Sequence, residues 1–77
     1  MYTNVINIGE LIAQKLKEKE RTMVWLAKKV GCDESNLRKT LKNSRYIYSD
    51  LLFSISVALE DDLFVYYSQK LKELENR

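Results

Sequence analysis

Apolar residues recur every three or four positions through most of this chain, which is the spacing of one face of an α-helix. Five such segments predict helices over residues 8–20, 22–30, 34–42, 49–59 and 62–74. Asn7 and Thr22 precede the first two segments and can cap them, whereas Gly31 follows the second and can adopt the left-handed conformation that ends a helix. With no proline and only two glycines, the chain has few sites for hairpin turns, so the pattern predicts an all-α fold.

The remaining helix starts also carry capping residues. Asp33 can cap the third segment, Ser49 the fourth, and Asp61 or Asp62 the fifth. The 77 residues contain no linker and no internal repeat, and they are too few for two independent cores. We therefore expect one domain over residues 1–77.

Only three residues, 31–33, separate the second and third predicted helices. Two helices joined so closely must pack at a steep angle, with the small Ala27 allowing their approach and Val30 and Leu37 filling the corner. These are the features of a helix-turn-helix. Its third helix would present outward a set of polar residues able to enter a DNA major groove: Glu34, Ser35, Arg38, Lys39 and Lys42.

The net charge of +2 conceals a division along the chain. Residues 21–45 hold seven cations and two carboxylates, a net charge of +5, whereas residues 49–77 hold three cations and six carboxylates, a net charge of −3. A basic middle favours a polyanionic partner, although solvated helix faces alone would give the same charges.

The residues around the predicted helix-turn-helix resemble those of a known protein family. The features that carry the resemblance are Leu26-Ala27, then Gly31, then Leu37, with a helix before them and Leu51-Leu52, Ile55 and Leu59 after them. Over about residues 8–68 the chain is similar to the bacterial lambda-repressor-like (Cro or XRE-type) DNA-binding domains. The chain resembles more closely a subgroup of this family, the small stand-alone bacterial regulators without a ligand-sensing domain. The residues that carry this closer resemblance are Trp25-Leu26-Ala27, Asn36-Leu37, Leu63-Phe64 and Tyr66-Tyr67-Ser68. The resemblance implies a five-helix domain with its helix-turn-helix at the second and third helices.

Motif position then assigns candidate DNA contacts. We expect base edges or groove walls to be met by Glu34, Ser35, Arg38 and Lys39. We expect phosphates to be met by Thr22, Lys28, Lys42 and Arg45. Glu34 is unusual beside a polyanion, and the hypothesis is that it accepts a hydrogen bond from cytosine while Arg38 or Lys39 contacts a guanine nearby. Tyr46 and Tyr48 could either donate to phosphates or cover the core.

A single short recognition helix reads few bases, so we expect a two-fold homodimer on DNA. The fifth helix is the expected interface, because it has more apolar groups than one small core can cover. The residues assigned to the interface are Phe64, Tyr66, Tyr67 and Leu71. Tyr66 lies about 100° around the helix from Tyr67, so one of the two is expected to face outward.

The composition also excludes several kinds of site. The chain has no histidine and one cysteine, Cys32, so a disulfide framework, a Cys/His zinc site and a His-dependent triad are excluded. We expect no enzyme activity, cofactor, metal or small-molecule ligand, and no membrane span, because no run approaches about 18 apolar residues. An unpaired thiol indicates the cytoplasm. We expect Cys32 to plug the turn as a small apolar group and Trp25 to be a partial core residue.

The function expected from the sequence is therefore a sequence-specific, double-stranded DNA-binding transcriptional regulator. Two alternatives stay open. An antitoxin would bind DNA with the same fold and a toxin through its acidic C-terminal helix. A protein-interaction helical bundle would keep the fold without affinity for DNA.

Overall fold

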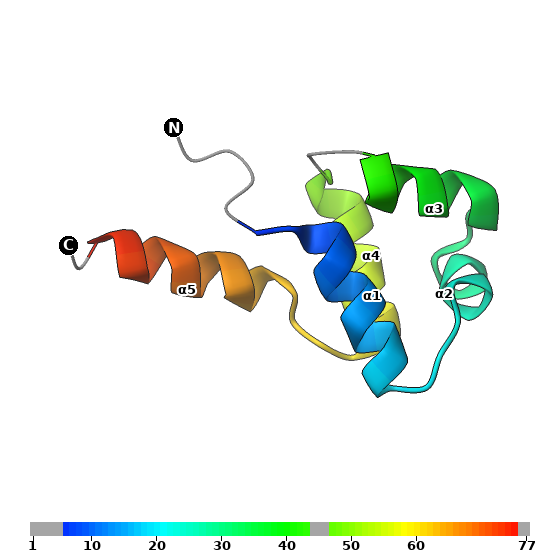
Figure 1. Ribbon diagram of the computed structural model, residues 1–77, viewed down its shortest axis with the longest axis horizontal. Coiled ribbons are helices and arrows are strands. Elements are labelled where there is room, and N and C mark those ends of the chain that lie inside the picture. The colour runs from blue at the N-terminus through cyan, green and yellow to red at the C-terminus, as the bar shows by residue number, and fades with distance from the viewer. Residues whose placement is uncertain (1–5, 44–46, 76–77) are drawn as a thin grey trace.

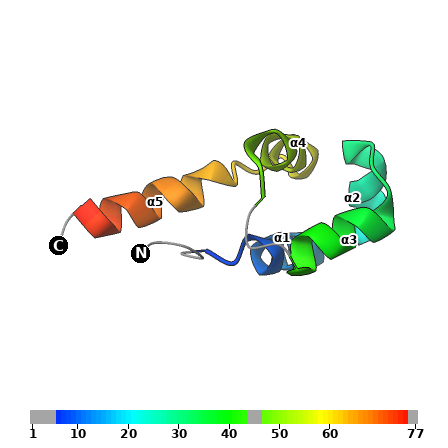
Figure 2. The ribbon, with the colours of Figure 1, turned by 90° about the horizontal axis from the view of Figure 1, so that it is seen from above.

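The computed structural model describes residues 6–43 and 47–75, which form helices and short connections without any strand. The helices are α1 (Ile8–Glu18), α2 (Met23–Val30), α3 (Glu34–Asn43), α4 (Ser49–Leu59) and α5 (Phe64–Glu75). The prediction of an all-α fold with five helices is confirmed. Figures 1 and 2 show α1 to α4 grouped together, whereas α5 runs away from them.

The core lies between α1, α2, α3 and α4. Among the described residues, every buried side chain is apolar. The buried residues are Ile8, Ile12 and Leu16 of α1, Leu26 and Ala27 of α2, Leu37 and Leu41 of α3, Leu52, Ile55 and Leu59 of α4, and Leu63. In α1, α3 and α4 their spacing is the three- and four-residue repeat seen in the sequence, whereas the two buried residues of α2 are adjacent. Burial of apolar surface holds the four helices together.

Local hydrogen bonds fix the starts and ends of the first helices. The Asn7 Oδ1 accepts from the Glu10 amide at 3.2 Å, and the Thr22 Oγ1 accepts from the Trp25 amide at 3.1 Å. Gly31 ends α2 in the left-handed conformation, with φ of 81°. These caps are the ones that the sequence predicts, because each depends on a single residue at the helix end.

The end of α1 and the cap of α4 differ from the prediction. The helix predicted over residues 8–20 ends at Glu18, since Glu20 is left-handed (φ 55°) and the Arg21 amide donates to the Leu16 carbonyl at 2.8 Å. The prediction that Ser49 caps α4 is wrong. Tyr48 holds the extended cap position without a side-chain hydrogen bond, and Ser49 is already the first helical residue.

The fifth helix begins at Phe64, two residues later than predicted. The Asp62 Oδ1 accepts from the Phe64 amide at 3.0 Å, which places the cap outside the helix. Leu63 lies between them and is fully buried, and its amide donates to the Ser56 Oγ at 3.3 Å. Leu63 therefore anchors the turn after α4 to the core and is not part of the apolar stripe of α5.

α5 itself buries none of its residues. Tyr66 and Tyr67, near its start, are both partly buried against the core, so neither faces outward as the sequence suggested. Lys15 of α1 reaches this junction, where its Nζ lies 3.3 Å from an Asp61 carboxylate oxygen and 5.3 Å from the centre of the Tyr66 ring. Hydrogen bonding to Tyr66 and then to Asp61 raises the pKa of Lys15, so the lysine remains charged in this contact.

No helix among the described residues has both the length and the apolar character needed to cross a bilayer.

α1 and α3 touch through their backbones at Gly9. A Cβ atom on Gly9 would overlap the carbonyl oxygen of Leu41, and it would lie 3.0 Å from the carbonyl carbon of the same residue. Because backbone atoms cannot rotate away as a flexible side chain can, any larger residue at position 9 must push the two helices apart.

We therefore expect Gly9→Ala to lower the free energy of unfolding by about 1–3 kcal/mol, the usual cost of overpacking. In an open helical position the same change would stabilise by about 0.5–1 kcal/mol, so the sign alone is informative. Urea denaturation measures the effect. Ala13→Gly is the control: Ala13 is exposed on α1, so this substitution measures the effect of helix propensity alone on the free energy of unfolding in the same helix. Stabilisation by Gly9→Ala would contradict the close contact.

Candidate nucleic-acid interface

α2 and α3 form a pair joined by residues 31–33. α2 packs against both α3 and α4, and α1 also packs against α3. Ala27 and Leu37 are each 2% exposed, and Val30 is partly buried against the core. Figures 1 and 2 show the two helices crossing at a steep angle. The apolar corner predicted from the sequence is therefore present, and it fixes which side of α3 faces outward.

The outer side of α3 is polar and exposed. Leu37 and Leu41 turn inward, and the Asp33 Oδ2 caps the helix by accepting from the Asn36 amide at 3.1 Å. Asn36 is exposed in the first turn of α3. Four further exposed residues occur at intervals of three and four, which places them on one face of the helix. They are Ser35, Arg38, Lys39 and Lys42.

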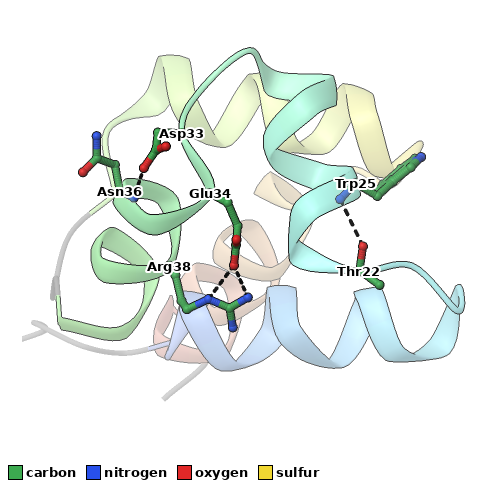
Figure 3. Close-up of polar contacts among 6 residues, drawn as sticks. All are labelled: Thr22, Trp25, Asp33, Glu34, Asn36 and Arg38. Atoms are coloured by element: carbon green, nitrogen blue, oxygen red, sulfur yellow. Dashed lines mark hydrogen bonds and ion pairs between the residues drawn. The ribbon is translucent and has the colours of Figure 1, made fainter.

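Glu34 and Arg38 are joined to each other across one turn of this helix. The Arg38 Nε donates to the Glu34 Oε2 at 2.9 Å, and the Arg38 Nη2 pairs with the same oxygen (Figure 3). The Glu34 side chain is 35% exposed, against 59% for Arg38. The sequence hypothesis gave the two residues separate base partners, whereas the structure brings them together. Their charges cancel, so Lys39 and Lys42 supply the positive charge of this face.

Two of the predicted phosphate contacts lie on α2 or at its start, and both Thr22 and Lys28 are exposed. The Thr22 Oγ1 accepts the cap hydrogen bond from the Trp25 amide (Figure 3), and its hydroxyl hydrogen can still be donated to an external acceptor. Arg45 and Tyr46 lie outside the described residues. Tyr48 is 70% exposed and does not cover the core.

The four residues assigned to a dimer interface divide into two pairs. Phe64 and Leu71 are exposed, at 37% and 57%, whereas Tyr66 and Tyr67 pack against the core of their own chain. Burial raises the pKa of the Tyr67 hydroxyl. Two of the four assigned residues are therefore exposed on α5, and Val65, which was not assigned, is 38% exposed as well.

Sequence reasoning missed a cluster around Trp25. The ring is partly buried against the core, as expected, and two cations lie over it. The guanidinium carbon of Arg21 is 5.0 Å from the ring centre and the Lys29 Nζ is 5.9 Å from it. Lys29 is one helical turn after Trp25, so its spacing could have indicated the contact. Arg21 precedes the cap Thr22, so its contact with the ring does not follow from helical spacing.

Cys32 is exposed, and the expectation that it plugs the turn is wrong. Its amide donates to the Ala27 carbonyl at 3.0 Å, and the corner is filled by Val30 and Leu37 instead.

Across residues 6–43 and 47–75, no three cysteine or carboxylate side chains are grouped so that they could hold a metal ion. Comparison with protein-family models, curated proteins and solved structures found no match to this chain. The candidate interface therefore rests on the chemistry and geometry of its own residues.

Proposed function

We propose that this protein is a double-stranded DNA-binding transcriptional regulator, in which α2 and α3 form a helix-turn-helix of the lambda-repressor-like type. The observation that carries the proposal is the exposed polar face of α3 on a helix whose other face is fixed in the core by Leu37 and Leu41. An α-helix with its side chains is about 10–12 Å across and a B-DNA major groove is about 12 Å wide, so α3 can enter the groove with its polar face against the bases.

Charge supports the same proposal. Residues 21–45 carry a net charge of +5, and duplex DNA binds such surfaces by releasing counterions. We assign phosphate contacts to Thr22 and Lys28, together with Lys42 and Arg45. Thr22 stands at the start of α2, where the helix dipole also favours an anion. Ser35 and Lys39 are assigned to the groove, together with Arg38.

The ion pair changes the role that we assign to Glu34. A guanidinium has five donor hydrogens. Glu34 accepts from the hydrogen on Nε and from one on Nη2. The remaining hydrogens on Nη1 and Nη2 of Arg38 can still donate to guanine O6 and N7. Holding the arginine in place reduces the rotamer entropy lost on binding. We therefore replace the cytosine hypothesis with a positioning role, in which Glu34 orients Arg38 toward guanine.

α5 supports a homodimer. A helix of 12 residues is marginally stable alone in water, and this one buries none of its residues within its own chain. Exposed Phe64 and Leu71 share a stripe with partly buried Tyr67 and Leu74. Pairing of this stripe with that of a second copy would cover it and would carry two copies of α3 on one duplex.

An antitoxin is the second candidate function, and the same stripe of α5 favours it. A toxin could cover Phe64 and Leu71 in place of a second copy, while α3 still binds DNA.

We expect binding to duplex DNA to weaken steeply with salt. If a dimer covers about 6 phosphates, the logarithm of the binding constant should fall against the logarithm of salt concentration with a slope of about −5. Fluorescence anisotropy with labelled duplex measures the slope. Lys42→Ala should weaken binding to all sequences about equally, whereas Lys17→Ala, exposed on α1, should change little. A flat salt profile would refute the phosphate contacts.

The positioning role of Glu34 predicts non-additive effects on base preference. Glu34→Gln should keep the fold, raise nonspecific affinity and reduce the preference for guanine at one base of each half-site by about 1–3 kcal/mol. In an Arg38→Gln background, Glu34→Gln should change base preference no further. The measurement is binding to all four bases at each position of a selected site. If Glu34→Gln instead removes a preference for cytosine, and does so in the Arg38→Gln background as well, Glu34 contacts a base itself.

The dimer proposal predicts that a charge in the stripe of α5 separates the copies. Leu71→Glu should give a monomer in analytical ultracentrifugation and weaken binding to a palindromic duplex, because each copy then binds alone. Phe53→Glu is the matched control, since Phe53 is 62% exposed on α4 and lies outside the stripe. A wild-type protein that stays monomeric at high concentration and binds a palindrome one to one would rule the dimer out.

A further inference from the structure

A groove lies between α2 and α4, and none of the residues that line it is assigned a contact with DNA. One wall is formed by Trp25 and Lys29 of α2 and by Arg21, which lies just before the cap of this helix. Val57 and Ala58, with Ser54 and Glu60, form the wall on the α4 side. The open groove has a volume of about 420 Å³, and an adjoining hollow of about 300 Å³ brings Lys19 to the same tryptophan.

This groove lies on the side of α2 away from the polar face of α3. No residue of α3 lines it. On the other side of α2, Met23 shares a separate hollow with Arg38 and Lys42 of α3. Trp25 is two residues from Met23, which is about 200° around the helix. A duplex bound along α3 would therefore leave the α2–α4 groove open.

The groove combines charged and apolar side chains. Arg21 and Lys29 lie over Trp25 from positions four residues before and after it, so cations flank an aromatic ring. Neither cation makes an ion pair with a described residue. The facing wall includes Val57, which is 61% exposed, and Glu60 is the one acidic residue in the lining. The groove thus combines two cations with an aromatic ring and an exposed aliphatic side chain.

We propose that this groove docks an acidic segment of a partner protein. The Arg21 guanidinium carbon lies 5.0 Å and the Lys29 Nζ 5.9 Å from the centre of the Trp25 ring, so the two cations are at most about 11 Å apart. An extended peptide of three or four residues spans such a distance. Carboxylates at the two ends of the segment pair with Arg21 and Lys29, and an apolar side chain between them contacts Trp25 and Val57. A DNA backbone would use the two cations but would leave this apolar surface without a partner, so the peptide fits the groove better.

Trp25 is the single tryptophan of the chain, so its fluorescence reports on the groove directly. The probe is a synthetic peptide, Asp-Glu-Phe-Glu-Asp, with blocked ends. We expect a saturable change in fluorescence, and about tenfold weaker binding to Lys29→Glu, a loss of about one ion pair. Lys17→Glu makes the same charge change on the exposed side of α1 and should bind the peptide as the wild type does. A peptide with serine in place of phenylalanine should bind several-fold more weakly.

Several results would overturn the proposal. One is the absence of a saturable change in Trp25 fluorescence at millimolar peptide. Another is an equal weakening of peptide binding by Lys17→Glu and Lys29→Glu. Competition between peptide and duplex, with Lys29→Glu weakening DNA binding as strongly as Lys42→Ala, would assign the groove to DNA instead. Lys29→Gln provides the same comparison if circular dichroism shows that Lys29→Glu is unfolded. The peptide titration contains no DNA, so its outcome is independent of the proposed regulatory function.

Discussion

The contact between Gly9 of α1 and the carbonyl of Leu41 in α3 sets the position of the helix on which the proposed function depends. α3 has 10 residues and would not be stably helical alone. Two buried leucines and this backbone contact hold it, and they leave a continuous polar face outward. Because base recognition requires side chains at fixed positions on a rigid element, a small displacement of α3 would affect every assigned contact at once. A glycine of α1, which shares a hollow with Arg38 and Lys42, thereby controls the position of the polar face.

The same four-helix core supports three separate surfaces. The polar face of α3 is assigned to the bases and the stripe of α5 to a second copy. The groove on the other side of α2 is assigned to an acidic segment. α2 stands between two of these surfaces, with Met23 toward α3 and Trp25 toward α4. Since the surfaces share no exposed residue, single substitutions such as Leu71→Glu can remove one while the others are kept.

The apolar spacing within each helix and the capping residues at its ends predicted most of the fold. Both ends of α4 match the predicted range, and the caps at Asn7, Thr22, Asp33 and Gly31 depend on one residue each. The differences come from tertiary context. Glu20 and Glu60 adopt left-handed conformations that usually indicate glycine, and Leu63 leaves its helical pattern to fill the core. For the candidate site, the sequence identified the exposed residues of α3 but treated them individually. The pairing of Glu34 with Arg38 was present in their spacing, whereas the α2–α4 groove requires two helices to be placed first.

The central claim is that the polar face of α3 binds duplex DNA. Amide chemical shifts of the ¹⁵N-labelled protein, titrated with a duplex selected from a random pool, test it residue by residue. We expect the largest changes at Ser35, Lys39 and Lys42 and at the start of α2, with small changes at Phe53 and Val57 on α4. Changes confined to α4 and α5, with the amides of α3 unmoved at saturating duplex, would contradict it.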